Sequence, residues 1–111
     1  MSGASPYTVG PSYLRIVFPA PGFFLNDTRL RVTVDGYPAL DASFTQGFDW
    51  WTEAQPGVHA VETSIAAPLG FARKKSYQLE VRPGLVTLAV LEYSRIWGNL
   101  TDAPRVSFVP R

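Results

Sequence analysis

The chain has 111 residues, a length that fits one domain rather than two. Its formal net charge is +1, with 17% charged and 14% aromatic residues. This near-neutral balance argues against the strongly basic surface that nucleic-acid binding usually requires. The aromatic and apolar content argues against disorder, because burial of these side chains can offset the entropy of the chain.

The chain contains no cysteine, which excludes disulfides, thiolate metal sites and thiol chemistry. Residues 1–6 lack the basic start and apolar run of a signal peptide. No apolar stretch approaches the roughly 20 residues of a transmembrane helix. We therefore expect a cytoplasmic protein without a transmembrane segment, the alternative being a protein from which a leader has been removed.

Turn residues divide the chain into short segments. Residues 1–11 are rich in Ser, Gly and Pro and are predicted to form a flexible arm before a single domain over 12–111. After the arm, Pro-Gly, Asp-Gly and similar turn pairs recur roughly every ten residues. Several of the intervening segments alternate between apolar and polar residues, which indicates strands rather than helices.

Eight strands are predicted in chain order. Alternation is clear in YLRIVF and RLRVTV, whereas LVTLAVLEY is apolar on both faces, which predicts a central strand covered on both sides. The predicted strands span residues 13–18, 29–34, 38–45, 48–53, 58–66, 76–82, 85–93 and 105–109. Seven or eight short strands at this spacing predict an all-β fold, a two-sheet antiparallel β-sandwich of immunoglobulin-like or transthyretin-like type, with a small barrel as the alternative.

Two peripheral features follow from the same pattern. Segments 38–45 and 105–109 carry few charges and are the candidate edge strands, where unpaired backbone groups favour association. The basic run over residues 73–75 is predicted to form a solvated loop, with contact to an anionic partner as the alternative.

Part of the chain resembles a known family. Residues 30–36 (LRVTVDG), 44–47 (FTQG) and 55–61 (QPGVHAV) resemble the small bacterial β-sandwich modules of the PEGA type, in which Val-Asp-Gly ends one strand and Pro-Gly-x-His opens another. The resemblance covers residues 30–61, and the Pro-Glu-Gly-Ala signature that names the family is absent. It implies a β-sandwich and a non-enzymatic, surface-attached or scaffold role, and it transfers no site residue.

The sequence predicts no catalytic residues, no metal site and no cofactor. His59 is the only histidine, so a histidine-rich zinc site is excluded. Its position after Pro-Gly predicts a bond to a turn carbonyl, and the alternative is a general base in a small hydrolase. The acidic residues are scattered singly. Asp35 and Asp41 flank a turn, where we expect them to bond to local backbone rather than to a cation.

Aromatic side chains give the strongest indication of function. Trp50 and Trp51 are adjacent in a predicted strand, so their rings point to opposite faces, one toward the core and one outward. An outward Trp beside Phe23 and Phe24 would form a patch suited to a protein, sugar or membrane surface. The alternative is that all these rings fill the core or cover a sheet edge.

A second aromatic group lies at the end of the central strand. Tyr93, Arg95 and Trp97 are two residues apart and would share one face if that strand continued. Arg95 would then stack between two rings, either to stiffen the sheet end or to recognise a ligand. The sequence as a whole predicts a non-enzymatic binding or scaffold module that uses an aromatic patch or an open sheet edge. Its partner is expected to be a protein or a second copy, with carbohydrate binding as the alternative.

Overall fold

The computed structural model describes residues 10–21, 27–66, 72–94 and 97–111. In these ranges the chain forms strands and no helix. The strands are β1 (Tyr13–Phe18), β2 (Arg29–Val34), β3 (Tyr37–Ser43), β4 (Phe48–Glu53), β5 (Gly57–Ile65), β6 (Arg73–Val81), β7 (Leu85–Val90), β8 (Tyr93–Ser94), β9 (Asn99–Leu100) and β10 (Arg105–Pro110). All eight predicted strands are present, and the arm predicted over residues 1–11 falls mostly outside the described residues.

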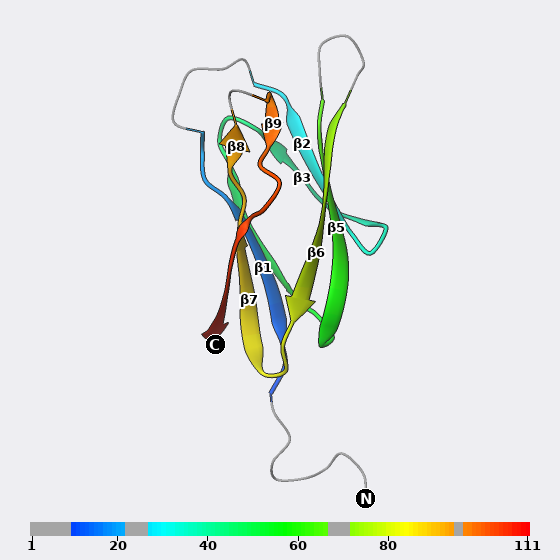
Figure 1. The fold of residues 1–111 in the computed structure, drawn as a ribbon, viewed down its shortest axis with the longest axis vertical. Helices are drawn as coiled ribbons and strands as arrows, with labels where there is room; N and C mark the ends of the chain where they lie inside the picture. Colours follow the sequence, from blue (N-terminus) through cyan, green and yellow to red (C-terminus); the bar gives the residue numbers. More distant parts are fainter. Residues whose placement is uncertain (1–9, 22–26, 67–71, 95–96) are drawn as a thin grey trace, which may run out of the picture.

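The eight longer strands form two sheets. Sheet A has the order β10-β7-β1-β4, and sheet B has the order β3-β2-β5-β6. Figure 1 shows them as two layers, with β1 and β7 in one and β5 and β6 in the other. The predicted β-sandwich is therefore confirmed. Its sheets are not wholly antiparallel, because β1 and β7 pair in parallel in the middle of sheet A.

The core lies between the sheets and follows the alternation of the sequence. In β1, Leu14, Ile16 and Phe18 are at most 1% exposed, whereas the intervening Arg15 is exposed. Full burial of such a side chain stabilises the fold by about 1.5–3 kcal/mol. Sheet B and the β7–β9 region supply the remaining buried apolar side chains, among them Leu30, Val32, Val61, Ile65, Tyr77, Leu79, Val81, Ala89, Leu91 and Leu100.

Two buried hydroxyl groups join the sheets along the seam between β6 and β7. Thr87 Oγ1 donates to the carbonyl oxygen of Glu80 at 2.8 Å. Ser12 Oγ accepts from the backbone N–H of Gly84 at 2.9 Å. Among the described residues, no buried side-chain polar atom lacks a hydrogen-bond partner, so this seam does not incur the cost of an unsatisfied polar group.

The basic run over residues 73–75 is not a loop. It forms the start of β6, because β5 extends far enough to pair Ile65 with Arg73 and Thr63 with Lys75. The Lys75 ammonium group also forms an ion pair with Asp102 at 2.6 Å. Backbone pairing with β5 thus makes this segment a strand, although its charged side chains are typical of a solvated loop.

Strand β7 is central, as predicted, but shorter than predicted. It lies between β1 and β10, and its outward-facing Leu88 and Val90 are half-buried rather than fully covered. After Val90 the N–H of Leu91 still donates to the carbonyl oxygen of Val17 at 2.8 Å, and the chain then leaves sheet A for the β8–β9 pair. The two predicted edges are confirmed, since β3 and β10 are each an outer strand of their sheet; β6 and β4 are the other two.

Candidate binding site

The outer face of sheet A is unusually apolar at its centre. Side chains alternate along a strand, so those of β7 that do not face the core point outward. They are Val86, Leu88 and Val90, where a solvated antiparallel strand ordinarily has polar residues. The outer face of sheet B shows the ordinary pattern, with Gln78 and Glu80 exposed on β6. The outer face of sheet A is therefore more apolar along its inner strand β7 than the outer face of sheet B is along β6.

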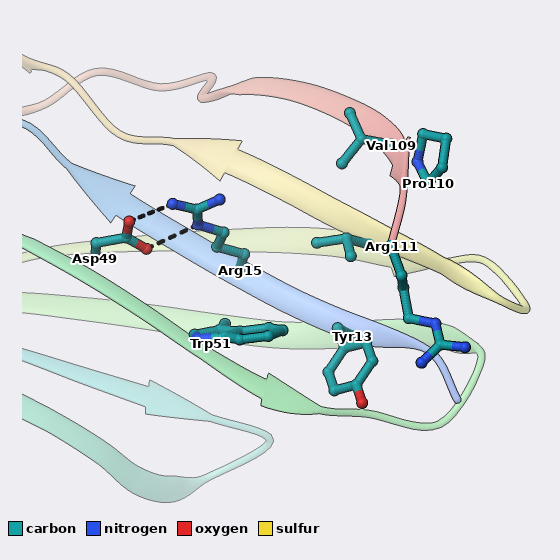
Figure 2. A pocket seen from close by; sticks show the side chains of 8 residues that line it. Tyr13, Arg15, Asp49, Trp51, Val109, Pro110 and Arg111 are labelled. Atoms are coloured by element: carbon teal, nitrogen blue, oxygen red, sulfur yellow. Dashed lines mark hydrogen bonds and ion pairs between the residues drawn. The ribbon is translucent and has the colours of Figure 1, made fainter. Parts of the chain in front are cut away.

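A hollow of about 560 Å³ lies across this outer face. Figure 2 shows its aromatic wall on β1 and β4, and the end of β10 on the opposite side. It combines an apolar floor with three charged groups. The lining residues are Tyr13, Arg15, Asp49, Trp51, Val86, Val109, Pro110 and Arg111.

The two adjacent tryptophans point to opposite faces, as predicted. Trp50 packs against the core, and Trp51 is 58% exposed on the outer face of β4. The Trp51 ring lies 5.1 Å from the ring of Tyr13 between centroids, with a tilt of 48°. These two rings form a bent aromatic wall along the hollow. Tyr13 was not predicted to belong to a site.

A two-point ion pair adjoins this wall. Arg15 Nε donates to Asp49 Oδ1 at 2.8 Å, and Arg15 Nη2 contacts Asp49 Oδ2. Arg15 lies directly opposite Trp51 in the β1–β4 ladder, and Asp49 is two residues before Trp51 on the same face. The hydrogen bonds from Arg15 hold the pKa of Asp49 below its usual range. This pair therefore presents a guanidinium group and a carboxylate in fixed positions beside the Trp51 ring.

Arg111 closes the opposite end of the hollow. Its guanidinium carbon lies 5.7 Å from the centroid of the Tyr13 ring, and Figure 2 shows the side chain directed toward that ring. No carboxylate of the described residues forms an ion pair with Arg111. The side chains that line the hollow therefore supply two guanidinium groups and one carboxylate.

Tyr93 and Trp97, which were also predicted to belong to a site, do not line this hollow. Phe23 and Phe24 lie outside the described residues, as does Arg95. The strand does not continue from Tyr93 to Trp97. β8 ends at Ser94, whose carbonyl oxygen accepts from Gly98 N at 2.9 Å in a turn toward β9. Trp97 lies in a turn, so it does not share a strand face with Tyr93.

Trp97 lies beside a separate hollow of about 450 Å³. Trp97 is 76% exposed, whereas Tyr93 packs edge-on against Phe44 at a centroid distance of 5.0 Å. The main polar groups around this second hollow are used within the fold, such as Asn99 Nδ2, which donates to the Lys74 carbonyl oxygen at 3.0 Å. The first hollow is therefore the better candidate for ligand recognition.

His59 connects two turns at one end of the sandwich. Its Nε2 lies 2.6 Å from the carbonyl oxygen of Gln55, which confirms the predicted bond to a turn carbonyl. Its Nδ1 lies 2.6 Å from Asp35 Oδ2, and Asp35 Oδ1 accepts from Ala60 N at 2.9 Å. Both ring nitrogens face acceptors, so the geometry favours the doubly protonated imidazolium. The bond to Gln55 raises the pKa of His59 most, and Asp35 raises it further, while burial opposes both.

This arrangement predicts a window of pH in which the His59–Asp35 pair stabilises the fold. The raised pKa of His59 gives stabilisation that is complete below about 6.5 and is lost as pH rises through the native pKa. The hydrogen bond from His59 lowers the pKa of Asp35, so its stabilisation is complete above about 3.9 and is lost at lower pH. NMR titration is expected to give a native pKa for His59 above 6.5, and the Asp35→Asn variant a lower one. An unchanged His59 pKa in Asp35→Asn would contradict this assignment.

The described ranges contain no group of three or more His, Asp or Glu side chains placed to hold a metal ion. They also contain no helix long and apolar enough to cross a membrane. No protein-family model matches the chain, and neither the curated proteins nor the solved structures include a significant match.

Proposed function

We propose that the protein is a non-enzymatic binding module that engages its partner through the hollow on sheet A. The observation that carries this proposal is the exposed Trp51 ring, which borders a hollow containing the Arg15–Asp49 pair. Exposed aromatic rings bring large contact area at low entropic cost. A concave, partly apolar surface with a few fixed polar groups is the usual form of a ligand site.

The state of the titratable groups supports binding rather than catalysis. A general acid at neutral pH needs a carboxyl group with a raised pKa. Every carboxyl group with a resolved shift here has a lowered pKa instead, because each accepts hydrogen bonds. Both nitrogens of His59 are occupied by Asp35 and Gln55, which leaves no nitrogen to accept a proton from a nucleophile. The hydrolase alternative therefore has little support.

We favour the sheet face over the two predicted edges, β3 and β10, as the contact surface. Edge strands are commonly protected by proline and by charged side chains. Strand β3 includes Pro38 and Asp41, and strand β10 includes Arg105 and Pro110. Such residues disfavour addition of a further strand, whereas the hollow on the face of sheet A has no comparable protection.

Replacement of Trp51 by alanine is expected to weaken binding by roughly 30-fold, the effect of losing a central aromatic residue from an interface. The test is a screen of the whole chain against an oligosaccharide array and a peptide array. Each ligand found is then titrated against the Trp51→Ala variant. Trp97→Ala removes an even more exposed ring elsewhere and should bind as the unaltered protein does.

Two results would contradict the proposal. One is a set of ligands whose affinity falls in Trp97→Ala and is unchanged in Trp51→Ala. The other is the absence of any ligand in both arrays. Circular dichroism of each variant establishes that the sandwich is retained, and Trp51 is exposed enough that its loss should leave the core intact.

A further inference from the structure

We propose that the hollow on sheet A binds an acidic oligosaccharide, a chain of pyranose rings bearing carboxylate groups. This inference rests on the proposed function and names the ligand class for the same site. Three features of the hollow support it, namely the aromatic wall, the Arg15–Asp49 pair and the guanidinium group of Arg111.

The aromatic wall suits the apolar face of a sugar ring. A pyranose presents C–H groups on its faces and hydroxyl groups around its rim. The C–H hydrogens carry partial positive charge and meet the negative face of an aromatic ring favourably. Trp51 and Tyr13 are tilted by 48° to each other, so they can contact a ligand along two planes. A bent chain of sugar rings has the corresponding shape.

The Arg15–Asp49 pair suits the hydroxyl groups on the rim. A guanidinium group has five N–H donors, and two nitrogens of Arg15 already bond to Asp49. The remaining N–H groups can donate to a ligand, and each Asp49 oxygen retains capacity to accept a further bond. A hydroxyl group both donates and accepts. Donors and acceptors held side by side therefore match a pair of neighbouring sugar hydroxyls.

Arg111 is the reason why we expect the ligand to be acidic. Arg111 and Arg15 carry positive charge and Asp49 carries negative charge, so the charged side chains of the hollow have a positive excess. The Arg111 guanidinium forms no ion pair with a described carboxylate, and it lies at the end of the aromatic wall. A planar guanidinium binds a carboxylate through two parallel hydrogen bonds. A sugar acid stacked on Tyr13 would present its carboxylate there.

The backbone of sheet A favours a sugar over an acidic peptide. A peptide that binds a sheet usually forms backbone hydrogen bonds with an unpaired strand edge. The hollow crosses β1 and β7, and both strands already pair with neighbours on each side. Their backbone groups are therefore committed to the sheet. A ligand on this face has to bind through side chains, and an oligosaccharide brings its own donors and acceptors.

The test compares trimers of galacturonic acid with their methyl esters, which are neutral but similar in shape. Titrations of the whole chain by calorimetry are expected to show binding of the acid at least about tenfold tighter than that of the ester. Arg111→Gln should reduce that preference to less than about twofold, while Trp51→Ala should weaken both ligands. Lys74→Gln, which removes a charge from sheet B, is the matched control and should leave both affinities unchanged. Trimers of mannuronic and guluronic acid extend the test to other acidic sugars.

Gly10 offers a second variant that leaves every charge in place. A Cβ atom at position 10 would overlap the Arg111 guanidinium, so Gly10→Ala should displace that group from the end of the hollow. The side chain of Arg111 is flexible, and the fold should tolerate the change. We expect Gly10→Ala to reduce the preference for acid over ester in the same direction as Arg111→Gln.

The outcomes separate the two proposals. Equal binding of acid and ester, or a preference that survives both Arg111→Gln and Gly10→Ala, would overturn the acidic sugar as ligand. If no acidic sugar binds but a peptide does so in a Trp51-dependent manner, the ligand class is wrong and the binding function stands. If nothing binds in a Trp51-dependent manner, both proposals fail.

Discussion

Replacement of Gly47 by alanine is expected to lower the free energy of unfolding by about 2–5 kcal/mol, through backbone strain and overpacking together. Gly47 lies between β3 and β4 with φ at +71°, a conformation that residues with a Cβ atom rarely adopt. An added Cβ would overlap the carbonyl oxygen of Phe18 and lie 2.7 Å from the backbone nitrogen of Ala20. Both are main-chain atoms, so the neighbours cannot yield as a flexible side chain would.

Gly36 provides the matched control for Gly47. Its φ is +82°, yet a Cβ atom there would have no neighbour within 4 Å. Gly36→Ala should therefore cost only the conformational term, about 1 kcal/mol. Urea denaturation of both variants and the unaltered protein measures the difference. Equal losses in the two variants would show that close approach to β1 is not what requires glycine at position 47.

The contact between Gly47 and Phe18 also bears on the site. It lies where β1 ends and β4 begins, next to the first pair of their ladder, Phe18 with Phe48. The same ladder sets Arg15 opposite Trp51 three pairs further along. A one-residue slip in this register would turn each outward side chain of β4 toward the other face. The close approach at Gly47 therefore helps to fix the register that assembles the aromatic wall and its ion pair.

Local pattern was sufficient to predict the strands, because strand formation here depends on alternation and turn residues. The Asp35-Gly36 pair predicts the β2–β3 turn, and both residues adopt positive φ. Which strands pair with each other was harder to predict from the sequence. The parallel contact between β1 and β7 joins segments about seventy residues apart, and no local feature of either sequence specifies it. The two-residue strands β8 and β9 are likewise too short to give a periodic pattern.

The candidate site was predictable only in part, for the same reason. Adjacent tryptophans in a strand must diverge, so one exposed ring was expected, and Trp51 is that residue. Two of its neighbours, Tyr13 and Arg15, come from a distant segment, since Arg15 is 34 residues from its ion-pair partner Asp49. Alternation does place Tyr13 and Arg15 on the outward face of the first strand. The sequence alone does not show that β4 pairs with β1, and this pairing brings Tyr13 and Arg15 next to Trp51.

Replacement of Phe18 by alanine is expected to reduce the free energy of unfolding by about 3–5 kcal/mol, the cost of removing a large core side chain and leaving a cavity. Phe18 is 1% exposed, and its ring lies 5.5 Å from that of Phe44 and 6.0 Å from that of Phe48 between centroids. A typical domain has a net stability of only about 5–15 kcal/mol, so this loss is a large fraction of the total.

Val17, the residue before Phe18, is the matched control because its side chain lies on the outer face of the same strand. Val17 points away from the core and is half-buried, so Val17→Ala should cost about 1 kcal/mol, a small part of the effect at Phe18. Chemical denaturation of the two variants gives the comparison, and a loss in Phe18→Ala no larger than in Val17→Ala would contradict the assigned core. Because Trp51 and Arg15 lie on the opposite face of sheet A, Phe18→Ala should retain its ligand affinity at temperatures where it remains folded. Loss of affinity in the folded variant would mean that the hollow depends on core packing and not only on the β1–β4 register.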